Sequence, residues 1–264
     1  MYRFLLRPKW LAFHLIVAIL VVVMVNLGLW QLHRLQDRRE FNAEVRERSA
    51  VAVVAFESLV HAETDPDDVA WRTVEATGAY LADEQVVVIN RSQSGVPGVD
   101  VITPIELADG TLVLVNRGFV SEIEPIPPPP SGTVTVVGHL RNSEQRRLGG
   151  LTDPEGDLTE IQRLDIDRLA AQLPGPVAPV SIELIESSPG QGAVPAPVPP
   201  PELSEGPHLS YMFQWWIFSA AAVAGWVLAV RHSARQVDGP NAPGEPTPAD
   251  SPSPTFDELP TAPH

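Results

Sequence analysis

The sequence contains no cysteine and few methionines, and these gaps exclude several kinds of site. Without cysteine the chain forms no disulfide, no thiolate metal site and no thioether bond to haem. Three of its 264 residues are methionine, one of them at position 1, which excludes a methionine-rich copper site. Common enzyme signatures are also missing: there is no Gly-x-Ser-x-Gly elbow, no His-Glu-x-x-His and no glycine-rich phosphate loop. Neither a copper carrier nor an enzyme of a familiar class is indicated.

Lysine, arginine, aspartate and glutamate are absent from two long stretches, 10–33 and 206–230. A helix of about 20 apolar residues crosses a hydrocarbon core of roughly 30 Å, so each stretch is long enough. A signal peptide is disfavoured because the first apolar run is too long and Leu29-Trp30-Gln31-Leu32 offers no small-residue cleavage site. A buried soluble helix is disfavoured because the neighbouring sequence is polar and proline-rich. We predict membrane-spanning helices over 10–30 and 208–230.

The formal net charge is −15, and it lies in the middle of the chain. Residues 1–30 carry +3 and residues 231–264 carry −3, so the two ends cancel. Nucleic-acid binding is disfavoured because contacts to phosphates need a basic surface. A solvated acidic surface is the favoured interpretation.

Basic residues flank the predicted spans and bear on orientation. Arginine and lysine precede the first span, and Arg231 and Arg235 follow the second, which favours two cytoplasmic ends. Arg34, Arg38 and Arg39, just beyond the first span, argue the other way. A long segment is translocated largely regardless of its charge. We therefore predict cytoplasmic termini and an extracytoplasmic middle domain.

The middle of the chain alternates between short β-like runs and turn residues. Ala108-Asp109-Gly110 predicts a hairpin, and Asp165 predicts the N-cap of a short helix over 165–173. The predicted strands are 72–80, 85–91, 99–105, 111–120, 133–140 and 180–187. The sequence thus predicts an α+β membrane protein with two transmembrane helices flanking a mainly antiparallel β domain, barrel- or sandwich-like.

Domain boundaries follow from these assignments. We expect a cytoplasmic N-terminus over 1–9 and an extracytoplasmic β-rich domain over 31–188 that begins with a charged helix. Residues 189–207 are rich in proline, glycine and alanine and predict an extended connector. Residues 231–264 hold few large apolar side chains and predict a disordered cytoplasmic tail.

Histidine is the residue type that most suggests a ligand site. His208 lies where the connector meets the second span, and an interfacial imidazole is either a metal or haem ligand or simply an amphipathic side chain at headgroup level. Tyr211 and Trp215 follow three and seven residues later, on the same helical face. Arg91 and Arg117, placed near strand ends, are expected to pair with carboxylates or backbone rather than to act in catalysis.

Four segments together resemble the surfeit locus protein 1 family of cytochrome c oxidase assembly factors. They are Leu27–Leu35, Val86–Gly98, Thr103–Val120 and Gly206–Trp215. Their order, spacing and two-span frame agree with the family over about residues 5–232. The residues that carry the resemblance are Gly28, Trp30, Gln31, Arg34, Arg91, Gly98, Pro104, Gly110, Asn116, Arg117, Gly118, Gly206, Pro207 and Gln214.

The resemblance implies a bacterial, multi-pass plasma-membrane protein that assists haem a delivery to subunit I of the haem-copper oxidase and is not an enzyme. His208 matches a proposed haem ligand, with Tyr211 and Trp215 as neighbours, so transient haem a is the implied cofactor. The implied partners are subunit I, haem a synthase and the lipid bilayer, and no nucleic acid. Two alternatives remain open: a membrane-anchored extracytoplasmic enzyme and a metal chaperone.

Overall fold

The computed structural model describes residues 3–146 and 149–238. Its contacts divide the chain into two units: His33–Pro207 forms one, and the segments before and after it form the other. The final helix begins at His208, as predicted, but continues to Asp238, past the predicted end of the span at residue 230. The rest of the predicted tail, 239–264, lies outside the described residues.

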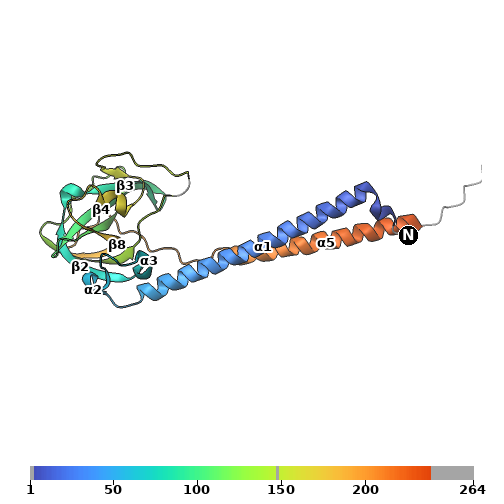
Figure 1. Ribbon diagram of the computed structural model, residues 1–264, viewed down its shortest axis with the longest axis horizontal. Coiled ribbons are helices and arrows are strands. Elements are labelled where there is room, and N and C mark those ends of the chain that lie inside the picture. The colour runs from blue at the N-terminus through green and yellow to red at the C-terminus, as the bar shows by residue number, and fades with distance from the viewer. Residues whose placement is uncertain (1–2, 147–148, 239–264) are drawn as a thin grey trace, which may run out of the picture. The chain divides into compact units, whose positions relative to one another are not determined.

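The elements follow one another from an N-terminal helix through a β domain to a C-terminal helix (Figure 1). The helices are η1 (Arg3–Leu6), α1 (Pro8–Ser49), α2 (Phe56–Leu59), α3 (Pro66–Val69), η2 (Ala82–Glu84), α4 (Ile166–Ala170) and α5 (His208–Asp238). The strands are β1 (Val54–Ala55), β2 (Thr73–Tyr80), β3 (Val86–Gln93), β4 (Val96–Leu107), β5 (Leu112–Ser121), β6 (Thr133–Arg141), β7 (Glu160–Ile161) and β8 (Val177–Ser188).

The sheet closes on itself as a barrel. Strand β2 pairs with β6, β6 with β8, β8 with β5, β5 with β4, and β4 again with β2. All of these pairs are antiparallel except β5 with β8, which run parallel. Closure leaves these strands no free edge, and a barrel of five strands is the architecture of OB folds. Of the two predicted alternatives, the barrel is the one found.

Strand β3 continues the path of β2 along the same partner. Tyr80 pairs with Ile105 of β4, and after a break containing η2, Val86 pairs with Ile102 of the same strand. The other edge of β3 pairs with the short strand β7. The predicted strands over 72–80 and 85–91 are therefore two halves of one interrupted strand.

Two apolar clusters lie on opposite sides of the barrel wall. Val113 and Val115 of β5 point into the barrel, while Leu114 between them packs outside against residues of α4. A strand buried on both faces needs apolar residues without alternation, which the run Leu112–Val115 supplies. Asp165 caps α4 as predicted, accepting a hydrogen bond from the Arg168 amide at 3.1 Å.

The charged end of α1 binds the connector. Arg38 donates to the carbonyls of Glu202 and Ser204 at 3.0 and 3.2 Å, and Asn42 donates to that of Leu203 at 3.0 Å. Asn42 is buried although the sequence around it is highly charged. The predicted charged helix is confirmed, and its polar side chains hold the connector in a defined path instead of only facing solvent.

Helices α1 and α5 both include a segment long and apolar enough to cross a membrane. Only 11 % and 6 % of the most apolar windows of these two helices are buried within the protein. In the unit that holds both predicted spans, α5 and the N-terminal part of α1 run antiparallel and side by side (Figure 1). A core helix of a soluble protein would be mostly covered, so the exposed apolar surface of this pair needs another partner.

Candidate functional site: one end of the helix pair

His208, the first residue of α5, contacts α1 through its imidazole ring. Its Nδ1 lies 2.8 Å from Oε1 of Gln31, and both side chains are half-buried. An amide oxygen only accepts hydrogen bonds, so Nδ1 of His208 carries the proton and donates it. In the neutral ring Nε2 then keeps a lone pair. The geometry gives His208 the form in which an imidazole binds a metal through Nε2.

Close packing of the two helices holds this pair in place. Gly28, one turn before Gln31, is buried, and a Cβ built on it would collide with the indole ring of Trp216. Trp216 lies about two turns into α5. Met24 and Met212, each one turn before Gly28 or Trp216 on its own helix, are also buried. Glycine at position 28 therefore lets the backbones approach closely, as small residues do at helix interfaces in membranes.

A second histidine joins the helices further along. Nε1 of Trp226 donates to Nδ1 of His14 at 2.8 Å, and the two rings meet edge to face. Because Nδ1 is here the acceptor, the proton of the neutral ring is on Nε2. His14 would have to lose that proton before Nε2 could bind a metal. Of these two histidines, only His208 has its outward nitrogen ready to act as a ligand.

A model of the SURF1 family matches residues 18–220. An uncharacterized SURF1-like protein of Mycobacterium tuberculosis is 33% identical over 229 residues, which cover 84% of this chain and 83% of the relative. A SURF1-like protein of Monosiga brevicollis is 29% identical over 229 residues, covering 80% and 84%. One from Rickettsia felis is 24% identical over 143 residues, covering 53% and 57%.

The chain belongs to the SURF1 family. This confirms the resemblance drawn from the four sequence segments. SURF1 proteins are known as cytochrome oxidase assembly factors, and the family is not known as one of enzymes. Among residues 3–146 and 149–238, no group of three or more histidine, aspartate or glutamate side chains is arranged to hold a metal ion.

The other residues that carry the SURF1 resemblance near the predicted spans differ in exposure and backbone conformation. Gly206 has a positive φ of 68°, which glycine adopts without strain, and Pro207 follows it directly before α5. Tyr211 is exposed and Trp215 half-buried, three and seven residues along α5. Trp30, Gln214 and Arg34 are exposed, and Arg34 pairs with Asp37 at 3.3 Å.

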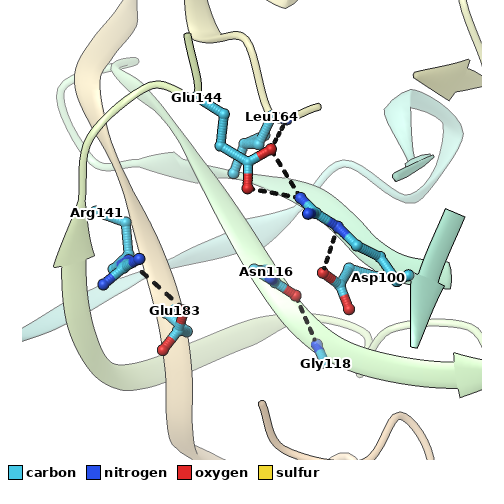
Figure 2. A network of polar contacts seen from close by, with 8 residues as sticks. Asp100, Asn116, Gly118, Arg141, Glu144, Leu164 and Glu183 are labelled. Carbon is cyan, nitrogen blue, oxygen red and sulfur yellow. Dashed lines mark hydrogen bonds and ion pairs between the residues drawn. The ribbon is translucent and has the colours of Figure 1, made fainter. Parts of the chain in front are cut away.

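Arg91 lies in a polar network with Glu144 and Asp100, which are labelled in Figure 2. Its Nη2 donates to both oxygens of Glu144, at 2.6 and 2.8 Å, and its Nε lies 3.1 Å from Asp100. Glu144 also accepts from the amide of Leu164 at 3.0 Å. The predicted structural pairing of Arg91 with carboxylates is confirmed. Neither carboxylate can be predicted from the sequence, because no local spacing links them to residue 91.

The same network borders a cavity of about 230 Å³. Arg141 lies 3.7 Å from Glu183 and stacks over the ring of Trp71 at 3.6 Å. Burial raises the pKa of Asp100, although the charge of Arg91 opposes this, and burial raises the pKa of Glu183 against the charge of Arg141. These ion pairs join the segment after β6 to β3, β3 to β4, and the end of β6 to β8.

Asn116, Arg117 and Gly118 form a bulge in β5. In the pairing with β4, Ile102 faces Asn116 and Val101 faces Gly118, so Arg117 is the extra residue. Oδ1 of Asn116 accepts from the Gly118 amide at 3.0 Å, and Gly118 has a φ of 126°. A Cβ at Gly118 would also collide with the backbone of Ala196, which pairs with Phe119. The bulge therefore changes the direction of the Arg117 side chain. Gly118 leaves room for Ala196 of the connector to pair with Phe119.

Arg117 is fully buried and is satisfied by neutral oxygens. It donates to Oε1 of Gln85 at 3.0 Å, to Oε1 of Gln191 at 3.2 Å, and to the carbonyls of Pro127 and Pro128 at 3.3 Å. Burial lowers the pKa of the guanidinium. Arg117 lies within β5, not at its end as expected, and its predicted pairing with backbone is found at Pro127 and Pro128.

Gly98, Pro104 and Gly110 complete the motif positions and serve the β4–β5 pair. Gly98 is packed against the ring of Phe119, where a side chain would not fit. Pro104 is buried, and its carbonyl accepts from the Leu81 amide at 2.9 Å. Gly110, with a φ of 83°, lies in the predicted hairpin turn. These three residues lie in the unit formed by His33–Pro207, whereas Gly28, Gln31 and Gln214 lie in the other unit, so the motif marks two separate sets of residues.

We expect Gly28→Val to weaken the helix pair, because overpacking a close contact costs about 1–3 kcal/mol. The midpoint of thermal unfolding of the full chain in detergent should fall. Ala18→Val, at an exposed position of the same helix, is the matched control and should leave the midpoint unchanged. Equal shifts in both variants would contradict the packing assigned to Gly28.

Arg117→Met should loosen the barrel, because each buried acceptor left without a donor costs about 1–3 kcal/mol. We expect the free energy of opening of the β5 and β8 amides to fall by about 3 kcal/mol in hydrogen exchange measured by mass spectrometry. Arg34→Met removes an exposed arginine and should cost under about 0.5 kcal/mol. If the two variants exchange alike, Arg117 does not hold the barrel and connector together.

Proposed function

We propose that this protein is a membrane-anchored assembly factor that assists haem a delivery to subunit I of the haem-copper oxidase, with haem a held transiently by His208. The protein binds haem a and passes it on, and it catalyses no reaction. The observation that supports this most is the hydrogen bond from His208 Nδ1 to Gln31, which leaves Nε2 available. The family supplies the oxidase assembly role, and the finer steps are our proposal.

The dimensions of the helix pair suit a bilayer. The two histidine contacts lie 17 residues apart on α1, from His14 to Gln31, which is about 26 Å along a helix. That length is close to the roughly 30 Å of a hydrocarbon core. Polar side chains joined in pairs near the two ends, with exposed apolar residues between them, fit two interfaces and a lipid-facing middle. We propose that both termini are cytoplasmic and the β domain extracytoplasmic.

The residues at the outer end fit a haem group. A haem a bound there would supply an iron atom, and the imidazole of His208 would hold it. His208 provides Nε2, and Gln31 holds the ring by its opposite nitrogen. Tyr211 lies one turn further on the same side of α5 and offers an exposed aromatic ring. An interfacial position lets a macrocycle remain in lipid while its carboxylates reach water.

Delivery requires a donor and an acceptor of the same group. We propose haem a synthase as the donor and subunit I as the acceptor, both reached within the membrane plane. Holding by one histidine would suit release, because a single protein ligand is easier to exchange than two.

His208→Ala should leave the protein inserted and abundant while lowering haem a occupancy and oxidase activity. The measurement is the haem a content of the purified protein together with oxidase activity in the same membranes. His14→Ala removes the other interhelical histidine and should keep the occupancy, because His14 carries its proton on Nε2. Full occupancy and full oxidase assembly with His208→Ala would show that His208 is only an interfacial residue.

Orientation is tested with alkaline phosphatase fused at Ser131 or, separately, after Arg235. Since the enzyme is active only outside the cytoplasm, we expect activity at Ser131 and none after Arg235. Activity after Arg235 with silence at Ser131 would reverse the proposed orientation.

A further inference from the structure

The hydrogen bond between Gln31 and His208 has a direction, because the two partners are chemically different. The amide oxygen of Gln31 accepts, and only a protonated Nδ1 donates to it across the 2.8 Å contact. A histidine free in solution exchanges its proton between the two ring nitrogens. Gln31 therefore selects one of the two neutral forms of His208, the one with the lone pair on Nε2.

Gln31 is well placed to make that selection because its backbone is fixed. It lies inside α1, a helix that runs without a break from Pro8 to Ser49. One turn earlier, Gly28 packs against Trp216, which anchors α5 two turns beyond His208. A side chain that orients a ligand is most effective when it stands on a rigid element.

The opposite arrangement at His14 shows that the selection is specific. There a tryptophan N–H faces Nδ1 at the same 2.8 Å, so the partner is a donor and the ring takes the other form. The two histidines belong to the same helix pair and differ in what faces Nδ1. Burial and helix packing alone would not divide them in this way.

We propose that Gln31 is a positioning residue that sets the tautomer and ring orientation of His208 and so makes Nε2 an axial ligand for haem. This proposal rests on the proposed function, in which His208 binds haem a. A hydrogen bond at the far nitrogen orients a ligating histidine and raises its basicity, and its loss typically lowers affinity about 10- to 100-fold. Gln31 itself touches no haem in this proposal and acts only through His208.

The first test needs no haem. The full chain is labelled with ¹⁵N in histidine and reconstituted in lipid nanodiscs, and the ring nitrogens of His208 are assigned by the signals that His208→Ala removes. We expect Nδ1 of His208 to be protonated and Nε2 unprotonated. Gln31→Leu should abolish this preference, whereas Gln31→Glu keeps an acceptor and should retain it. Unchanged signals from His14 show that each variant folds, and Gln31→Met replaces the leucine variant if that one does not.

The second test titrates the same proteins with haem a and follows the Soret band. We expect Gln31→Leu to weaken binding about 10- to 100-fold and Gln31→Glu to restore it. Asn26→Leu is the matched control, since its amide bonds only to the carbonyl of Val22 in the same helix, and it should change neither readout.

The two tests separate the two claims. If Gln31→Leu leaves the tautomer of His208 and the affinity for haem unchanged, Gln31 is not a positioning residue, even though His208 still binds haem. If His208→Ala binds haem a as tightly as the natural protein, the proposed function fails at His208, and the role of Gln31 toward haem fails with it.

Discussion

The close approach of α1 and α5 at Gly28 is the contact on which the rest of the helix pair depends. Without a side chain at this position, the indole ring of Trp216 packs directly against the backbone of α1. That contact brings Gln31 within hydrogen-bond distance of His208 at one end and Trp226 within reach of His14 at the other. In lipid there is little hydrophobic force between helices, so such close packing and interhelical hydrogen bonds supply the specificity.

The β domain contributes by fixing the connector that leads into α5. The bulge at Arg117 turns a fully buried guanidinium toward the proline segment and Gln191, while Gly118 leaves room for Ala196 to pair with Phe119. Farther along, Arg38 and Asn42 of α1 bind the carbonyls of residues 202–204. The connector therefore runs to Pro207 along a path held at two places. Its proline content disfavours other secondary structure, but these hydrogen bonds define its course.

Local patterns in the sequence predicted the elements well, and long-range partners poorly. The uncharged stretches, the Asp109-Gly110 turn and the Asp165 cap depend on neighbouring residues, and each prediction is confirmed at the level of the helix or turn. The barrel closes through the pairing of β2 with β4, and Arg91 pairs with Glu144. Both contacts join residues far apart in the chain, which no sequence spacing reveals. His208 and Gln31 were each singled out, but only the structure brings them together, 177 residues apart.

The proposed function depends on His208 presenting Nε2 to haem a at one end of the helix pair. The most direct measurement is the absorption spectrum of the full chain purified from membranes of two strains, one that makes haem a and one that lacks haem a synthesis. We expect a Soret band of haem a in the first preparation and its absence in the second. Identical spectra without bound haem in both preparations, or copper bound in place of haem, would contradict it.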